Sequence, residues 1–467
     1  MRKLYWYITA YFKKHGWIFA VSVAGALIVF SFSIPAIAQR LERKPRHYIG
    51  LIGKHTLYNL PLSIQNQLSA GLTKTAQDGT VNPYLAERWA IEDGGKIYRF
   101  VIKKGVRWQD GQELKPNDVE YNLPDVEILT TPNDIIFKLP DEYAPFPTIV
   151  AQPIFKTVQK KYLMFFKQPM LIGIGKYTLE SYKHDGQKIT EIVLSGINEK
   201  FIYRFYFTED EAVLAFKRGE VDELPDLSSP HDVSGWPNVE VNKQMNNDRY
   251  LAVFFNNSHP LFPKSVRQAL SYATNKPEGK EGALGPINPD SWAYLEGGKS
   301  YNYDLDRAIE RILDEIPPEP LNIELTTTDN FVTEAEQIKQ DWEKLGMETY
   351  QACLNKNTVS DKDQCVNTKV QVNIRVTNFP DTSNFQALLI GQEIPSDPDQ
   401  YHLWHSQQGT NFTGYKNTRI DALLEKGRKI AEKNERKAIY QEFQQFLLED
   451  APAVFLKHLA SYEVKRK

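Results

Sequence analysis

Carboxylates and imidazoles, side chains that often bind metal ions, gather between residues 397 and 405. Asp397 and Asp399 are followed by His402 and His405. Oxygen and imidazole ligands of this kind suit several transition metals. The two histidines are only three residues apart, however, in a segment whose conformation the sequence does not define. We therefore predict no metal site in this segment.

Motifs of covalent catalysis are missing from the sequence. There is no G-x-S-x-G nucleophile elbow, no H-E-x-x-H zinc motif and no dinucleotide-binding fingerprint. The tripeptide Gly298-Lys299-Ser300 resembles the end of a phosphate-binding loop, but Ala293 occupies the position of the required earlier glycine. We interpret the tripeptide as an exposed turn and the acidic run Glu209–Glu211 as the start of a helix. The sequence predicts neither an enzyme nor a bound cofactor.

Two cysteines, Cys353 and Cys365, are the only ones in the chain. They flank a segment rich in Lys, Asp and Asn, which we interpret as a surface loop. A disulfide that closes this loop would suit an oxidising, extracytoplasmic compartment, and this is the pairing that we predict. Two free thiols are the alternative. A zinc site is disfavoured because no further cysteine and no close histidine completes a set of four ligands.

Charge is distributed unevenly along the chain. The formal net charge is −3, from 56 basic and 59 acidic residues. The first 47 residues contain eight basic side chains and one acidic side chain, so the remainder has 48 basic against 58 acidic residues. A mildly acidic body lacks the basic stripe that nucleic acid requires. We therefore expect no nucleic-acid partner.

The N-terminal region contains a long apolar stretch, Trp17–Ala38, and residues 16–39 carry no charge. About 20 apolar residues suffice to cross the hydrocarbon core of a membrane. We predict an uncleaved anchor in the cell membrane, with the body of the protein outside the cytoplasm. The alternative is a signal peptide, because Ala36-Ile37-Ala38 resembles a cleavage site. Cleavage there would release a secreted or periplasmic protein.

The strands that must position any functional side chain follow from periodicity and turn residues. Asp93-Gly94-Gly95 is a tight-turn cluster, and the run Ile97–Ile102 after it alternates as a half-buried strand does. Tyr250–Phe255 is a nearly continuous apolar run, which predicts a strand buried on both faces. Further strands are expected at residues 135–139, 189–194, 321–326, 370–376 and 385–390.

Helices are predicted between many of these strands. Thr208 is expected to cap a helix that Gly219 ends, and Thr333–Leu345 is expected to be a capped helix that ends at Gly346. Other helices are expected at 265–273, 417–431 and 436–448. Strands that alternate with helices predict an α/β fold, and 467 residues are enough for two lobes.

The segment Asn82–Asp118 carries an ordered series of residues that resembles the start of a known family. The matching positions are Pro83, Leu85, Ala86, Glu87, Trp89, Gly95, Tyr98, Phe100, Gly105, Val106, Trp108, Asp110, Gly111, Asp118 and Val119. Further matches follow in the family's order at residues 219–222, 255–257, 266–270, 397–399, 411–421 and 449–452. With these residues the chain resembles the solute-binding proteins of oligopeptide and dipeptide ABC importers, extracellular solute-binding protein family 5.

This resemblance implies a two-lobed periplasmic-binding-protein fold, type II-like with an enlarged first lobe, that closes by hinge motion. We expect the N-terminal stub, apolar segment and linker at 1–47, lobe I at 48–252, lobe II at 253–452 and a return toward lobe I at 453–467. The implied function is to bind a peptide or similar small solute between the lobes and to deliver it to an ABC permease in the membrane. The alternative is a membrane-tethered structural or sensory ectodomain that kept the fold without transport.

The resemblance also implies where a solute binds. The segment from Asp397 to Asn411 would help to line the cleft, and Tyr401 and Trp404 would supply apolar walls. Asp397 and Asp399 are either ligand-binding residues or structural residues of a turn.

One departure from the family concerns the capture of a peptide's α-amino group. In peptide-binding members, an aspartate three residues before the Asp-Pro position pairs with that group. Here Ile394 stands at this position, and Glu393 beside it is the residue that could substitute. We therefore include Glu393 among the predicted ligand-binding residues.

Overall fold

The computed structural model describes residues 6, 9–11, 13–18, 21–27, 29, 44–162, 166–356 and 359–467. The predicted membrane stretch, Trp17–Ala38, lies only partly within these ranges, because residues 19, 20, 28 and 30–38 fall outside them. Among the described residues, no helix combines the length and the apolar character needed to cross a membrane. The membrane anchor therefore stays a prediction.

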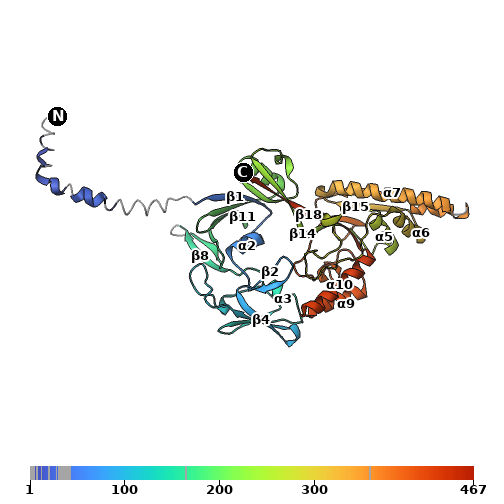
Figure 1. Ribbon diagram of the computed structural model, residues 1–467, viewed down its shortest axis with the longest axis horizontal. Helices are drawn as coiled ribbons and strands as arrows, with labels where there is room; N and C mark the ends of the chain where they lie inside the picture. Colours follow the sequence, from blue (N-terminus) through green and yellow to red (C-terminus); the bar gives the residue numbers. More distant parts are fainter. Residues whose placement is uncertain are drawn as a thin grey trace.

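A ten-stranded sheet runs through both halves of the molecule, in the order β10-β11-β12-β1-β13-β18-β14-β17-β15-β16 (Figure 1). We call the half that contains β1 to β13 lobe I and the half that contains β15 to β17 lobe II. The long strands β14 and β18 lie between the halves and belong to both. The bounds are β1 Arg46–Ile52, β10 Thr178–Asp185, β11 Lys188–Ser195, β12 Lys200–Tyr206, β13 Glu223–Leu227, β14 Val239–Phe255, β15 Leu321–Thr327, β16 Val370–Val376, β17 Ala387–Glu393 and β18 Ala453–Arg466.

Strand β14 joins the two lobes. Its apolar part, Tyr250–Phe255, pairs with β17 on one side and with β18 on the other, and all its side chains are buried, as predicted. Alternate side chains enter hydrophobic cores on opposite faces of the sheet. The pairing with β18 shifts between Asn246 and Tyr250, so that Asn247–Arg249 bulge out of the ladder. This bulge lies where β14 passes from lobe I to lobe II.

A second sheet in lobe I has the order β4-β5-β7-β6 and is antiparallel. The predicted turn Asp93–Gly95 joins β4 to β5, and Gly94 has a φ of 64°, a conformation that glycine adopts without a steric penalty. Tyr98, Phe100 and Trp108 are buried in the core of this part. The segment with the strongest family resemblance is therefore scaffold. The bounds in this region are α2 Leu62–Leu68, β2 Thr73–Thr75, β3 Val81–Pro83, β4 Ala86–Glu92, β5 Ile97–Ile102, β6 Glu127–Thr130, β7 Asp134–Lys138, α3 Phe146–Ile149, β8 Lys156–Tyr162, β9 Phe166–Ile172 and α4 Glu209–Lys217.

Helices cover both faces of the sheet in lobe II (Figure 1). One core lies between the sheet and the helices α5, α6 and α7, and it receives Leu251 and Val253 of β14. The other core lies between the sheet and the helices α9 and α10, and it receives Tyr250 and Phe254. The bounds are α5 Lys264–Ala273, α6 Leu305–Asp314, α7 Val332–Lys356, α8 Tyr401–Trp404, α9 Thr418–Lys429 and α10 Lys433–Asp450.

One predicted helix cap, Thr208, is confirmed, and one predicted helix end, Gly346, is wrong. The Thr208 side chain accepts a hydrogen bond from the Glu211 backbone N–H at 3.2 Å, and α4 ends just before Gly219. Asn417 caps α9 through the backbone N–H groups of its first turn. The prediction for α7 is wrong, because this helix continues past Gly346 to Lys356. A Cβ atom at Gly346 would lie 2.3 Å from the backbone nitrogen of Val370, so this glycine serves the close packing of α7 on β16.

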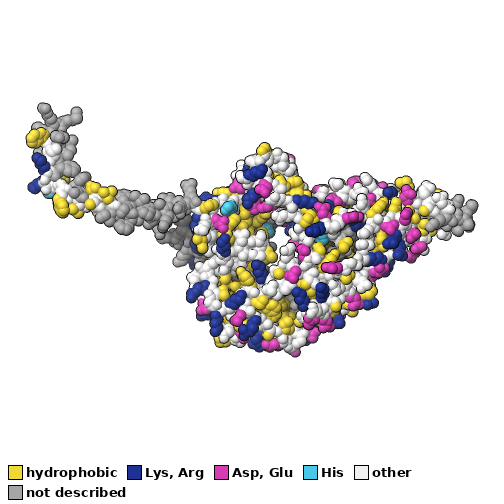
Figure 2. All heavy atoms as spheres, viewed as in Figure 1, with side chains coloured by type: hydrophobic (Ala, Val, Ile, Leu, Met, Phe, Trp, Pro, Cys, Tyr) yellow, Lys and Arg dark blue, Asp and Glu magenta, His cyan; other side chains and the backbone are white. Residues whose placement is uncertain are grey.

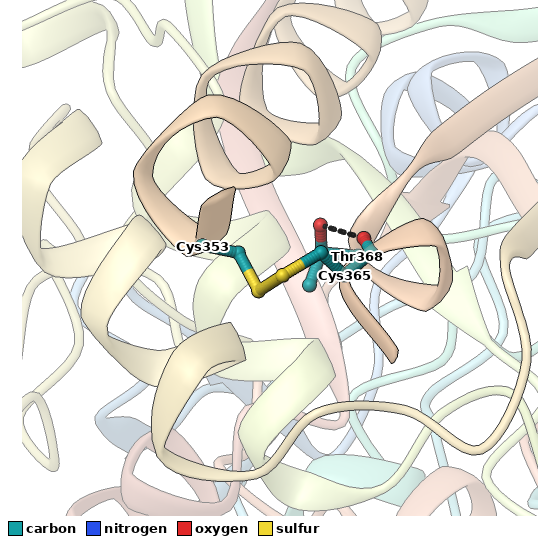
Figure 3. Close-up of a disulfide and its surroundings, with 3 residues drawn as sticks. All are labelled: Cys353, Cys365 and Thr368. Atoms are coloured by element: carbon teal, nitrogen blue, oxygen red, sulfur yellow. Dashed lines mark hydrogen bonds between the residues drawn. A yellow bond between two sulfur atoms is a disulfide. The ribbon is translucent and has the colours of Figure 1, made fainter. Parts of the chain in front are cut away.

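The structure joins Cys353 and Cys365 in a disulfide, the first of the two alternatives (Figure 3). Cys353 lies in α7, and Cys365 lies in a 3₁₀ segment that ends at Thr368, whose hydroxyl donates to the Cys365 carbonyl at 2.8 Å. Both cysteines are fully buried. The predicted surface position holds for Asn355, Asp363 and Gln364, which are exposed beside the buried cysteines, but the cysteines lie in a helix and a 3₁₀ segment and not in a loop.

Candidate functional site

The two lobes touch at the turn between β2 and β3. The carbonyl oxygen of Asp78 accepts a hydrogen bond from the backbone N–H of Trp292 in lobe II at 3.0 Å. Gly79 has a φ of +78°, and a Cβ atom there would lie 2.4 Å from the carbonyl oxygen of Ser396. Only glycine combines this conformation with this close approach. Lys433 of α10 also donates to the Thr80 hydroxyl at 2.8 Å, so the lobes are in contact around a shared space.

A cavity of about 260 Å³ lies beside this contact and is walled by lobe I, the β14 bulge and lobe II together. Its lining residues are mostly polar: Ala76, Gln77, Gly79, Met245, Asn246, Asn247, Asp248, Asn288, Asp290, Ser291, Ile394, Pro395 and Ser396. A neighbouring cavity of about 680 Å³ shares Ala76, Gln77 and Ser396 with it and extends along lobe I. We call the two together the interlobe cleft. Its dimensions are those of a site for a small molecule or short peptide.

Two carboxylates line the smaller cavity of the interlobe cleft. Asp290 accepts hydrogen bonds from the side-chain amides of Asn247 at 3.0 Å and Gln77 at 3.5 Å. The Asp248 backbone N–H donates to the Asn246 side-chain oxygen at 3.4 Å, whereas no hydrogen bond or salt bridge joins the Asp248 carboxylate to another described residue. Asp248 is exposed, but partial desolvation raises the pKa of its carboxyl group, while the guanidinium of Arg249 opposes that shift. The cleft therefore presents negative charge and amide groups, which suit a solute with a cationic group and polar backbone atoms.

Asp397, one of the predicted ligand-binding residues, lies inside lobe II. Its two carboxylate oxygens accept hydrogen bonds from the Arg436 guanidinium at 2.5 and 2.7 Å, and both side chains are buried. Arg436 also donates to the Gly427 carbonyl at 2.7 Å. This bidentate pair ties the loop before α8 to α10.

Asp399 and Tyr401 surround Arg428, which points toward lobe I. Asp399 pairs with the Arg428 Nε at 3.1 Å and accepts a hydrogen bond from the Tyr401 backbone N–H at 3.1 Å. The Arg428 guanidinium lies 4.3 Å from the ring centroid of Tyr401 and 4.9 Å from that of Tyr143 in lobe I. The Arg428 carbonyl accepts a hydrogen bond from the Ala144 N–H at 2.6 Å. These residues hold an interlobe contact.

The other predicted ligand-binding residues lie in different surroundings. Trp404 is fully buried in the core that contains Phe254. The Asn411 side chain braces its own loop by donating to the Tyr415 carbonyl at 2.9 Å. The Glu393 side chain is 83% exposed and lies 3.9 Å from Arg249. Binding of a solute by any of the six predicted residues stays a prediction.

Sequence reasoning missed most of the residues that line the interlobe cleft. They come from the β2–β3 turn, the β14 bulge, the loop around residue 290 and the segment Ile394–Ser396. Two local signals mark part of this set: the turn dipeptide Asp78-Gly79 and the polar run Asn246–Asp248, which interrupts a strand before its apolar part. Neither signal says which segments meet.

The carboxylates and imidazoles near residue 400 have other partners. Asp397 pairs with Arg436, Asp399 pairs with Arg428, and the His405 Nε2 atom lies 3.2 Å from a Glu425 carboxylate oxygen. Within the part of the chain that the structure describes, no three or more His, Cys, Asp or Glu side chains are grouped to hold a metal ion.

Comparison with known proteins places the fold in a family. The model of bacterial extracellular solute-binding proteins, family 5 Middle, matches residues 80–131 and 129–395. The chain belongs to this family. The resemblance that starts at Asn82–Asp118 is thus confirmed, and so is the two-lobed α/β fold. A member of family 5 is an extracytoplasmic solute-binding protein, and the family does not consist of enzymes.

Relatives of this family 5 protein cover nearly its whole length. It is 25% identical to the oligopeptide-binding protein AppA of Bacillus subtilis, over 87% of this chain and 85% of the relative. It is 24% identical to the dipeptide-binding protein of Escherichia coli, over 83% and 82% of the two chains. The crystal structure of NikZ from Campylobacter jejuni, in complex with Ni(L-His), superposes with a TM-score of 0.66 at 21% identity, over 91% and 94% of the chains. The last comparison shows a shared fold.

Proposed function

We propose that this protein is the solute-binding component of an ABC importer and that it holds a peptide or similar small solute in the interlobe cleft. The observation that carries the proposal is a polar cavity walled jointly by lobe I, the β14 bulge and lobe II. A site built from both lobes forms only when they close, so solute binding and closure are coupled. The names of two relatives, an oligopeptide-binding and a dipeptide-binding protein, support a peptide as the solute.

In this proposal the carboxylates of the cleft bind the amino terminus of the peptide. Asp248 is the better candidate for a direct ion pair, because it lines the cavity and its carboxylate has no hydrogen bond or salt bridge to another described residue. Asp290 would assist, although it already accepts bonds from Asn247 and Gln77. The side-chain amides would bind peptide backbone groups. Asp397 and Asp399 would position the loop that presents Ser396, and Arg428 would stabilise the closed form.

The bulge Asn247–Arg249 is the proposed hinge. A bulge interrupts the ladder between β14 and β18 at the place where β14 enters lobe II, so the strands can twist there with few hydrogen bonds to break. The closed protein would carry its solute to a permease, and opening at the hinge would release the solute. In hinge motions, a few residues at the ends of helices or strands commonly take up the change in backbone dihedral angles.

We also propose that Trp17–Ala38 anchors the protein in the membrane. The length and apolar character of the stretch support an anchor, and cleavage after Ala38 is the alternative. Membrane fractionation followed by N-terminal sequencing distinguishes the anchor from the cleaved signal peptide. An intact N-terminus in the membrane fraction supports the anchor, and a new N-terminus at Gln39 in the soluble fraction contradicts it.

The importer proposal is tested by native mass spectrometry of the full chain in detergent, followed by titration with a library of short peptides. We expect a co-purified peptide, or a peptide-dependent rise in melting temperature that an N-acetylated library gives more weakly. No bound solute together with no thermal shift would contradict the proposal and favour a structural or sensory ectodomain.

A further inference from the structure

Lobe II contains a separate cavity that shares no lining residue with the interlobe cleft. It has a volume of about 430 Å³ and lies where the C-terminal end of α5 and its following loop face the start of β18. Its walls come from four parts of the chain: residues 271–284, residues 299–303, the end of α10 and residues 453–456. A volume of this size accommodates a small organic molecule.

One wall of the lobe II cavity carries the half-buried side chain of Lys276. Its Nζ atom donates to the carbonyl oxygen of Tyr301 at 2.6 Å. An ammonium group has three donors, so two more are available. No carboxylate among the described residues forms a salt bridge with Lys276, and burial lowers the pKa of its amine to about 7. The positive form of Lys276 therefore lacks a counter-ion.

The second lysine of the cavity differs from Lys276. The Nζ atom of Lys299 lies 2.6 Å from a carboxylate oxygen of Glu449 at the end of α10. Lys276 and Lys299 lie 5.7 and 5.1 Å from the centre of the Tyr301 ring, within the range of a cation–π contact. Glu278 also lines the cavity, and it forms no salt bridge with Lys276. The positive charge of Lys299 is thus neutralised, and that of Lys276 is not.

Part of the cavity lining is apolar. Leu448 comes from α10, and Val454, Phe455 and Leu456 come from the start of β18. Ala283 joins the loop that follows α5 to β18, because its backbone N–H donates to the Leu456 carbonyl at 3.3 Å. A molecule that fills the space would meet both the cationic group of Lys276 and apolar surface.

We propose that the lobe II cavity binds a small organic anion, with its carboxylate or phosphate group paired to Lys276 and its apolar part against Phe455 and its neighbours. The site is distinct from the interlobe cleft and goes beyond the proposed transport function. An anion would supply the missing counter-ion of Lys276 and use its two remaining donors. Because Phe455 and Val454 belong to a strand that both lobes share, an occupied cavity stabilises that strand.

Isothermal titration of the full chain with hexanoate, hexyl phosphate and hexanol tests this site. We expect saturable binding of one or both anions and none of the alcohol. Binding of hexanoate alone identifies a carboxylate site, and binding of hexyl phosphate alone identifies a phosphate site. Lys276→Met should weaken anion binding about 10- to 100-fold, because a charge-assisted interaction is lost. The control is Lys280→Met, an exposed lysine on the same loop that does not line the cavity, and it should bind as the unmodified protein does.

A labelling experiment on the unmutated protein keeps the test independent of how the variants fold. An amine-reactive reagent at pH 7.5 is followed by peptide mass spectrometry, with and without the anion that binds. The anion should protect Lys276 and leave Lys280 unprotected. The proposal is overturned if neither anion binds, if hexanol binds as well as the anions, or if protection is equal at the two lysines.

Discussion

The backbone N–H of Ile394 donates a hydrogen bond of 2.7 Å to the carbonyl oxygen of Asp248. This bond connects the end of β17 to the bulge of β14 and brings Ser396 and the Asp248 side chain to one cavity. Peptide-binding relatives are expected to carry an aspartate at the position of Ile394. In this chain a carboxylate from the neighbouring strand, that of Asp248, lines the same cavity as Ile394.

Asp248→Asn tests the role of this carboxylate. The substitution keeps the shape of the side chain and removes its charge, so affinity for a peptide with a free amino terminus should fall on the order of 10- to 100-fold. Isothermal titration measures the change, and an N-acetylated peptide is the control, because it lacks the charge that Asp248 would bind. Equal losses for both peptides would contradict an ion pair at this position.

Glu393→Ala distinguishes Glu393 from Asp248 as the partner of the amino group. Glu393 is 83% exposed, and interactions between exposed charges contribute only about 0–1 kcal/mol, so affinity should change by less than about fivefold. A loss as large as that of Asp248→Asn would assign the amino group to Glu393 instead. The same titration measures both variants.

Arg436→Met should destabilise lobe II strongly. The substitution leaves the Asp397 carboxylate buried without its bidentate partner, which costs about 3–5 kcal/mol. Urea unfolding followed by circular dichroism measures the free energy of unfolding. Arg419→Met is the matched control, because Arg419 pairs with Glu442 at the exposed surface and its loss should cost about 1 kcal/mol or less. If the two substitutions lowered the free energy of unfolding equally, the buried pair would contribute no more to stability than the exposed pair.

Gly346→Ala should lower the free energy of unfolding, although alanine favours helices. Helix propensity favours alanine by about 1 kcal/mol, but the added Cβ atom would lie 2.3 Å from the Val370 nitrogen. Forcing α7 and β16 apart should cost up to about 3 kcal/mol, which exceeds this gain by up to about 2 kcal/mol. Gly235→Ala is the control, since a Cβ atom at Gly235 meets no atom within 4 Å. A variant more stable than the parent would contradict the close-packing role of Gly346.

The stability of the protein should fall between pH 7 and pH 5. Burial lowers the pKa values of His458 and His402, so the folded state releases protons that the unfolded state still binds. The histidines of the unfolded chain titrate near pH 6.5, so the free energy of unfolding decreases as the pH falls below about that value. Urea unfolding at several pH values measures this decrease. His458→Asn should weaken the dependence of the free energy of unfolding on pH. An unchanged dependence would contradict the role of His458 in this decrease.

Local patterns in the sequence determined much of the scaffold. The turn at Asp93–Gly95, the strand Ile97–Ile102 and the Thr208 cap are confirmed because each depends on neighbouring residues alone. The run Tyr250–Phe255 predicted a strand buried on both faces, because a continuous apolar run has no solvent-facing side. The ordered motifs also identified the family.

The interlobe cleft was decided by the tertiary structure. Its walls come from residues near 77, 247, 290 and 395, and no periodicity or capping pattern links segments so far apart. They meet because β14 pairs with β17 and β18 and then bulges between Asn246 and Tyr250. The same holds for Gly346, which resembles a helix end in sequence but is required by a strand that follows later in the chain. Side-chain periodicity depends on the nearest residues, whereas a binding cleft depends on which distant strand edges pair and in which register.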